Sequence, residues 1–168
     1  ANAMAIYPEY RGSRTSWGIG VLGSVVVEVE LENGVIGVGI STAGPPGCWL
    51  IEHHLKQFAI GQNVTNVELI WDQMWRASMP YGRKGITIHA ISAIDLAIWD
   101  AMGKDAGEPV YELLGGPLRS TLSLYATSPA AASVKKQGFQ GVKVPLPYGP
   151  SSGSEGLKKN VELISGVR

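Results

Sequence analysis

A run of apolar residues between Ala90 and Met102 constrains this chain more than any other feature. Its apolar side chains fall on every side of a helix: Ala90, Ile91, Ala93, Ile94, Leu96, Ala97, Ile98, Trp99, Ala101 and Met102. A helix that is apolar all round is buried all round. Asp95 and Asp100 interrupt the run, which is too short to span a membrane. We therefore expect a central helix that ends near Gly103 and has other elements packed on several faces.

Upstream of this helix the sequence predicts a β-hairpin. Apolar and polar residues alternate from Val25 to Glu32, which is the period of a half-buried strand. Asn33-Gly34 is a strong hairpin turn, and residues 35–41 return as the partner strand. The glutamates of the first strand are expected to face water.

Two further helices are expected between the hairpin and the central helix. Residues 41–47, STAGPPG, consist of turn formers and predict a loop. Residues 49–59 and 67–79 then carry apolar residues at helical spacing. The first of these helices contains His53 and His54, which point in different directions and have no ligand pattern around them. We interpret both as surface or packing residues.

The pattern changes after the Gly115-Gly116 pair, which ends a short helix that Pro109 begins. Residues 122–127 and 141–146 predict short strands, and residues 130–137 and 156–166 predict helices. Strand–helix–strand–helix order with short links indicates parallel βα units. A closed βα barrel needs eight strands. The sequence therefore predicts an α+β domain followed by the start of a barrel that this chain does not complete.

Composition excludes several classes of function. The 14 basic and 14 acidic residues balance to a net charge of zero, which gives no electrostatic footprint for nucleic acid or an anionic membrane. Cys48 is the single cysteine, so an internal disulfide is excluded and a reducing compartment is indicated. No segment is typical of a signal peptide or transmembrane helix. These features predict a cytoplasmic location.

The acidic residues of the central helix do not form a catalytic pair. Asp95 and Asp100 are five residues apart, which is not one helical face. We expect structural carboxylates, buried or half-buried, bonded to backbone or to Arg/Lys partners.

Several segments carry a family resemblance that covers nearly the whole chain from Tyr7. Residues 91–116, ISAIDLAIWDAMGKDAGEPVYELLGG, closely resemble the end of the N-terminal capping domain in the mandelate racemase branch of the enolase superfamily. Residues 13–34, 41–48 and 138–150 are most similar to the L-rhamnonate dehydratases of that branch. The resemblance implies a capping domain over residues 1–117 and the first two βα units of a barrel over residues 118–168. It also implies that the loop at 41–47 reaches over the barrel mouth, and that the protein forms homo-oligomers.

The resemblance also implies site residues. Arg14 matches an arginine that contacts the substrate in those enzymes, and guanidinium suits a carboxylate. Without the resemblance, Arg14 is a solvated loop residue. Lys143 lies near the carboxyl end of a barrel strand and can offer positive charge to a substrate carboxylate; the alternative is a lysine that only ends the strand in solvent. Many relatives carry a second, basic lysine two positions later, where this chain has Pro145.

The implied reaction is a dehydration of a small sugar acid. In the family, Mg²⁺ stabilises the anion formed when a base removes the proton next to a carboxylate, and a general acid then assists loss of the neighbouring hydroxyl. The metal ligands and the acid/base lie on later barrel strands, so this chain contributes no catalytic residue and no metal ligand and is expected to be inactive alone. Alternatives are another acid-sugar dehydratase, a racemase of the same branch, or a non-catalytic capping or assembly module.

Overall fold

The computed structural model describes residues 3–10 and 18–167, which form two compact units. One unit spans residues 17–117, and the other combines residues 1–16 with residues 118–168. In chain order the elements are η1 (Ala3–Ile6), η2 (Pro8–Tyr10), η3 (Ile19–Leu22), β1 (Val25–Glu30), β2 (Ile36–Ser41), α1 (Gly44–Leu50), η4 (Ile51–Leu55), η5 (Lys56–Phe58), α2 (Val67–Ser78), α3 (Ile86–Ala106), α4 (Val110–Leu113), β3 (Tyr125–Thr127), α5 (Ala131–Lys136), β4 (Gly141–Lys143), η6 (Pro150–Ser152) and α6 (Gly153–Val167).

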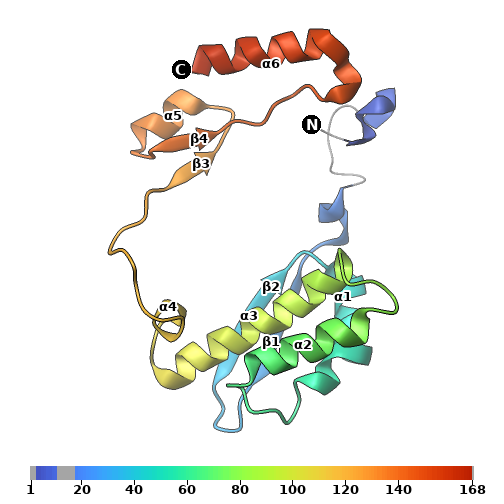
Figure 1. Ribbon diagram of the computed structural model, residues 1–168, viewed down its shortest axis with the longest axis vertical. Helices are drawn as coiled ribbons and strands as arrows, with labels where there is room; N and C mark the ends of the chain where they lie inside the picture. Colours follow the sequence, from blue (N-terminus) through green and yellow to red (C-terminus); the bar gives the residue numbers. More distant parts are fainter. Residues whose placement is uncertain (1–2, 11–17, 168) are drawn as a thin grey trace. The chain divides into compact units, whose positions relative to one another are not determined.

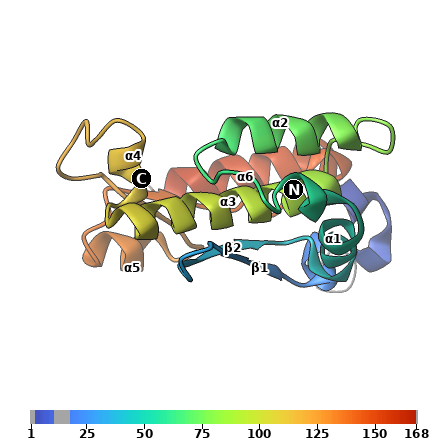
Figure 2. The same cartoon turned by 90° about the horizontal axis from the view of Figure 1, so that it is seen from below.

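The first unit has three layers, with α3 in the middle. The antiparallel hairpin β1–β2 lies on one side of α3, and α2 lies on the other (Figures 1 and 2). The buried core joins α3 to α2 and to the end of η4 through Leu55, Ile70, Met74, Ile91 and Ile98. Burying each such side chain contributes about 1.5–3 kcal/mol. The α+β arrangement and the central helix predicted from the sequence are confirmed.

Glycine and alanine bring β2 and α3 into backbone contact. Gly37 and Gly39 are buried on the face of β2 that meets the helix. A Cβ atom on Gly39 would overlap the Ala93 carbonyl oxygen, and one on Gly37 would overlap the Ala97 carbonyl oxygen and crowd Ala101. Ala93, Ala97 and Ala101 are four residues apart and share one helix face. The small side chains on both elements therefore set the distance between strand and helix.

The large side chains of β2 face away from this contact. Ile36, Val38 and Ile40 alternate with the glycines and are exposed, Ile40 by 60 %. On β1 the arrangement is the usual one, because Val25, Val27 and Val29 face the helix while the glutamates face water. Hydrophobicity alone would place the β2 side chains inward. They point outward because only glycine leaves room for α3.

Side chains from α3 bind the free edge of β2. The Asp100 carboxylate accepts a hydrogen bond from the Val38 N–H at 2.7 Å, and Lys104 donates one to the Ile36 carbonyl oxygen at 2.9 Å. Asp100 and Lys104 also form an ion pair with each other at 2.7 Å. At the tip of the hairpin, the Asn33 amide donates to Asp105 at 2.6 Å. These bonds occupy backbone groups that an edge strand otherwise leaves open.

Two boundaries differ from the sequence prediction, one at the hairpin loop and one at the end of α3. The hairpin loop has three residues, Glu32–Gly34, because Leu31 and Val35 still pair through a backbone hydrogen bond. The helix continues past Gly103 and ends before Gly107, whose φ is 68°. Glu108 N–H bonds to the Gly103 carbonyl and Gly107 N–H to the Lys104 carbonyl, which is a Schellman motif.

The length argument against a membrane span was wrong, because α3 has 21 residues and is long and apolar enough to cross a membrane by length and composition. Half of its most apolar window is buried within the chain. Burial in the three-layered unit therefore accounts for the apolar character of the helix. The prediction of a buried central helix stands on that observation instead of on length.

The expectation of a loop over residues 41–47 was partly wrong. Helix α1 begins at Gly44, inside this segment, and continues without a break into η4 and η5. Pro45 and Pro46 occupy its first turn, where the missing N–H groups of proline are not needed. Cys48, on the same helix, is exposed. Turn-forming residues here start a helix because proline fixes a helical φ.

The second unit contains a parallel strand pair. β3 and β4 pair in parallel with Tyr125 opposite Gly141 and Thr127 opposite Lys143, and α5 connects them (Figure 1). α5 packs against β4, and its Val134 is buried. The predicted strand–helix–strand–helix order is confirmed. Among the described residues this unit has two paired strands, fewer than a closed barrel needs.

We expect Gly39→Ala to destabilise the first unit by at least about 2 kcal/mol, because the added methyl group overpacks a backbone contact. Ile40→Ala is the matched control, since its side chain is exposed and its loss should cost less than about 1 kcal/mol. Urea unfolding followed by tryptophan fluorescence measures both, because all five tryptophans lie between residues 17 and 99. Equal stability of the two variants would contradict the close-contact interpretation.

Candidate functional site

Lys143 lies at the carboxyl end of β4, next to Thr127 at the carboxyl end of β3. Paired residues of neighbouring strands present their side chains on the same face of a sheet, so Lys143 and Thr127 share one face. Both are exposed. The alternate positions, Ala126 and Val142, are half-buried. Since α5 packs on β4, these observations place α5 on one face and Lys143 on the other.

The face that carries Lys143 corresponds to the interior of a βα barrel. Connecting helices form the outer ring of such barrels, and active sites lie at the carboxyl ends of the strands. Among the described residues, Lys143 has no ion-pair partner. An exposed ammonium group without a protein carboxylate beside it is available to an anionic ligand. The structure places Lys143 at the carboxyl end of β4, and its substrate-binding role stays a prediction.

Arg14, the other predicted substrate-binding residue, lies outside the described residues. Its proposed contact with a substrate carboxylate stays a prediction. The division of the chain into a capping domain over 1–117 and a barrel portion over 118–168 also stays a prediction. The structure groups the described residues 3–10 with residues 118–167.

The two carboxylates of α3 behave differently. Asp100 is bonded to the Val38 N–H and to Lys104, as predicted for a structural carboxylate, and these bonds lower its pKa below the usual value. Asp95 is half-buried and, among the described residues, has no hydrogen-bond or ion-pair partner, which the sequence did not predict. Burial, followed by the nearby charge of Glu68, raises the pKa of Asp95.

The histidines form pairs with neighbouring side chains. His53 stacks on Trp49, with ring centroids 4.8 Å apart, and His54 shares a 2.7 Å hydrogen bond with the Tyr81 hydroxyl. Both therefore pack as predicted. His89, which the sequence did not single out, lies with its Nδ1 atom 3.2 Å from the Ser41 hydroxyl. Residues 41 and 89 are distant in sequence, so only the packing of α3 on β2 reveals this contact.

Metal-ligating side chains do not cluster among the described residues. No group of three or more His, Cys, Asp or Glu side chains there is close enough to hold a metal ion. Asp95 and Asp100 lie on different helix faces, and the histidines are bonded to hydroxyl groups or stacked on a ring. These residues do not fit Mg²⁺, which is bound through carboxylates and water.

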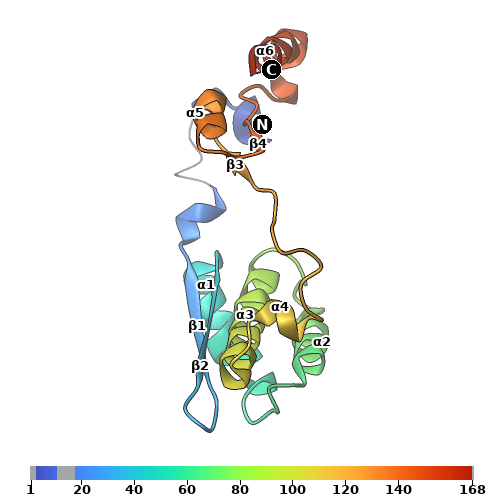
Figure 3. The same cartoon turned by 90° about the vertical axis from the view of Figure 1, so that its left-hand side faces the viewer.

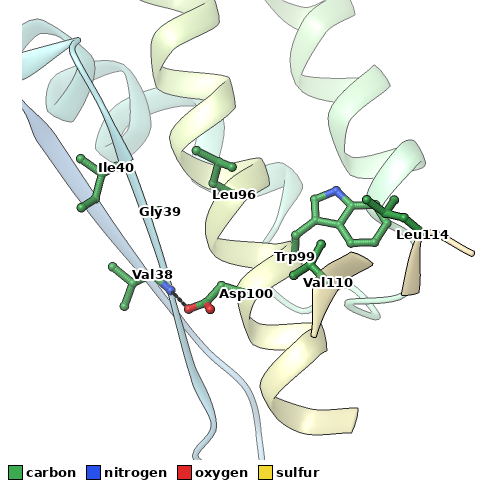
Figure 4. Close-up of a pocket in the computed structure, with 8 residues that line it drawn as sticks. All are labelled: Val38, Gly39, Ile40, Leu96, Trp99, Asp100, Val110 and Leu114. Atoms are coloured by element: carbon green, nitrogen blue, oxygen red, sulfur yellow. Dashed lines mark hydrogen bonds between the residues drawn. The ribbon is translucent and has the colours of Figure 1, made fainter. Parts of the chain in front are cut away.

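An open, apolar hollow of about 530 Å³ lies along the edge of β2 (Figure 4). Val38, Gly39 and Ile40 line one side. Leu96 of α3, Val110 of α4 and Leu114, directly after α4, line the other. Asp100 is its titratable residue, and that carboxylate is already bonded to Val38. The hollow lacks convergent polar groups of the kind that orient a reacting ligand.

Comparison with known proteins identifies relatives over the whole chain. The family model "Mandelate racemase / muconate lactonizing enzyme, N-terminal domain" matches residues 17–115. A protein of Caldivirga maquilingensis with the provisional name L-rhamnonate dehydratase is 55% identical over 168 residues, 100% of this chain and 42% of the relative. The L-rhamnonate dehydratase of Saccharopolyspora erythraea is 53% identical over 100% of this chain and 43% of its own length. The chain thus spans less than half the length of these relatives.

Solved structures agree with this result. The crystal structure of L-rhamnonate dehydratase from Gibberella zeae superimposes with a TM-score of 0.93 at 49% identity, covering 98% of this chain and 42% of that one. A second structure of the Gibberella zeae enzyme, complexed with Mg, gives a TM-score of 0.91 at 50% identity over 95% of this chain and 39% of that one.

The two carboxylates of α3 predict opposite pH effects. The raised pKa of Asp95 means that the free energy of unfolding falls as pH rises from the ordinary carboxyl value through the raised one, so Asp95→Asn should stabilise the protein at pH 7. The lowered pKa of Asp100 contributes stability above the ordinary value, which is lost as pH falls through the lowered one. Asp100→Asn should therefore destabilise at pH 7, by about 1 kcal/mol for a partly exposed hydrogen bond.

Urea unfolding of both variants and the wild type at pH 7 and at pH 4 measures these effects. Each difference from the wild type should shrink at the lower pH, because about half of the carboxyl groups are then protonated in the unfolded state. Differences of the same sign at pH 7 would show that the two environments were misassigned.

Proposed function

Because this chain belongs to the mandelate racemase / muconate lactonizing enzyme family, we propose that it is part of a dehydratase that acts on L-rhamnonate or a closely related sugar acid. The observation that carries the proposal is the identity of 53% and 55% with relatives of that name over every residue of this chain. The proposal concerns the longer protein, since the chain covers 42% and 43% of those relatives.

The proposed reaction removes a proton next to the substrate carboxylate and then the hydroxyl group of the neighbouring carbon. A 2-keto-3-deoxy sugar acid is the product. Mg²⁺, when bound, would supply positive charge that offsets the charge developing in this reaction. The described residues do not fit that ion, so we expect its ligands and the acid/base groups in the part of the longer protein beyond this chain.

This chain's contribution to the proposed reaction is the binding of the substrate carboxylate. The Lys143 ammonium group is exposed on the inner face of the β3–β4 pair, and its charge is not neutralised by a described carboxylate. A cation in this position attracts an anionic substrate to the mouth of the barrel. Arg14 is the second proposed contact, on the strength of the family resemblance alone.

Pro145 favours dehydration over racemisation. Racemases of this branch use a lysine at the matching position as a base, and proline has no titratable group. Residue 145 lies two positions past the end of β4, and its proline side chain cannot act as such a base. We therefore place the base of the proposed dehydratase elsewhere in the longer protein.

The test of the proposed function is turnover of a panel of sugar acids by the full-length protein, with and without Mg²⁺, scored for 2-keto acid formation. We expect metal-dependent turnover of L-rhamnonate and recovery of unreacted substrate without inversion of the carbon next to the carboxylate. Absence of turnover with every sugar acid would overturn the dehydratase proposal. Inversion without loss of water would favour the racemase alternative.

In the same protein, Lys143→Ala should raise the KM for L-rhamnonate by about tenfold or more, because loss of a charge-assisted hydrogen bond costs about 1.5–3 kcal/mol. Lys136→Ala is a matched control, since Lys136 lies in the last turn of α5 and is exposed. An unchanged KM in Lys143→Ala would show that this lysine only ends the strand in solvent.

A further inference from the structure

The segment that follows Lys143 is fixed at both of its ends. At its start, the Lys143 carbonyl oxygen accepts a hydrogen bond from the Ser128 N–H at 3.1 Å, which extends the β3–β4 pairing by one step. At its far end, Tyr148 is attached to α6. Residues 144–147, which separate these two points, have the sequence Val-Pro-Leu-Pro, and both prolines have fixed φ angles.

Asn160 makes the far attachment with both polar atoms of its side chain. Its Oδ1 atom accepts a hydrogen bond from the Tyr148 N–H at 3.3 Å, and its Nδ2 group donates one to the Tyr148 carbonyl oxygen at 2.9 Å. The asparagine amide thus pairs with the backbone of Tyr148 much as a neighbouring strand would. Only an amide side chain has a donor and an acceptor in this arrangement.

Other residues on the same face of α6 support the attachment. Gly156 is buried, and a Cβ atom there would come within 2.9 Å of the Tyr148 Cβ atom. The Lys159 ammonium group lies 5.6 Å from the centre of the Tyr148 ring, within cation–π range. Positions 156, 159 and 160 are three and four residues apart, so they form one helix surface. Helix α6 therefore contacts the backbone, the Cβ atom and the ring of Tyr148.

These contacts relate α6 to the candidate substrate site. The loops at the carboxyl ends of barrel strands form the active site, and the segment 144–148 is such a loop, directly beside Lys143. Its two prolines leave it few internal degrees of freedom, so its position depends on where Tyr148 is attached. A misplacement of about 1 Å in a substrate-positioning group can cost about a hundredfold in rate.

We propose that Asn160 is a positioning residue for substrate binding: its side-chain amide fixes the 144–148 loop on α6 and thereby sets the geometry beside Lys143. The proposal rests on the proposed dehydratase function for its substrate. The attachment itself is independent of that function. Asn160 acts through the backbone of Tyr148 and does not contact the substrate.

The test compares three variants of the full-length protein with the wild type. Asn160→Leu removes both hydrogen bonds at similar volume, and we expect the KM for L-rhamnonate to rise by about tenfold with a smaller change in kcat. Asn160→Asp retains the acceptor for the Tyr148 N–H and loses the donor, so its KM should lie between those of wild type and Asn160→Leu. Lys158→Ala, an exposed neighbour on α6, is the control and should match the wild type.

Hydrogen exchange at the Tyr148 amide provides a readout that needs no activity. Exchange should be slow in the wild type and at least about tenfold faster in Asn160→Leu, with an unchanged melting temperature of the first unit. Rapid exchange in the wild type would overturn the attachment. Faster exchange in Asn160→Leu with an unchanged KM would overturn the positioning role. A wild-type protein that turns over no sugar acid would overturn the proposed function and leave the exchange experiment to decide the attachment.

Discussion

The backbone contact between β2 and α3 is the constraint on which the first unit depends. Gly37 and Gly39 on the strand meet Ala93, Ala97 and Ala101 on the helix, and a Cβ atom at either glycine would overlap the helix backbone. The approach brings the helix near enough for Asp100 and Lys104 to reach around the strand and bind its free edge. It also turns α3 into a middle layer, with the hairpin on one side and α2 on the other (Figure 3).

This arrangement explains why one helix carries so many apolar residues. Small residues of α3 face the strand, where the two backbones are in contact. The larger Ile91, Ile94 and Ile98 pack in the core that α3 shares with α2. The close approach has a cost in β2, because the large apolar side chains of this strand are exposed on its outer face. Asp95 also lowers stability at neutral pH, because its half-buried carboxylate has no hydrogen-bond or ion-pair partner in the part of the chain that the structure describes.

In the second unit, strand pairing determines where the candidate site residue lies. Parallel pairing brings the carboxyl ends of β3 and β4 together, and α5 on one face leaves Lys143 on the other. Among the described residues, Lys143 has no ion-pair partner. Its proposed role rests on its position at the end of β4 and on the family resemblance. The loop after it is then held by Asn160, which acts from a separate helix.

Many of the secondary-structure elements of this protein can be predicted from its sequence. The all-round apolar run predicts α3, alternation predicts β1, and the spacing of apolar residues after Gly116 predicts the parallel βα units, because each of these signals is local to one element. The family resemblance likewise predicts Lys143 and Arg14 as substrate-binding residues, and both roles stay predictions. Where a turn former lies next to a helix the local signal misleads, as at Gly103 and at Pro45.

Contacts between distant segments lie beyond such signals. The outward direction of Ile36, Val38 and Ile40, the bonds from Asp100 to Val38 and from His89 to Ser41, and the Asn160–Tyr148 pair all depend on which elements pack together and how closely. The sequence of a strand gives the periodicity of its side chains. Which of its two faces is buried depends on the element that packs against it. In β2 that element is α3, and the space it leaves admits glycine alone.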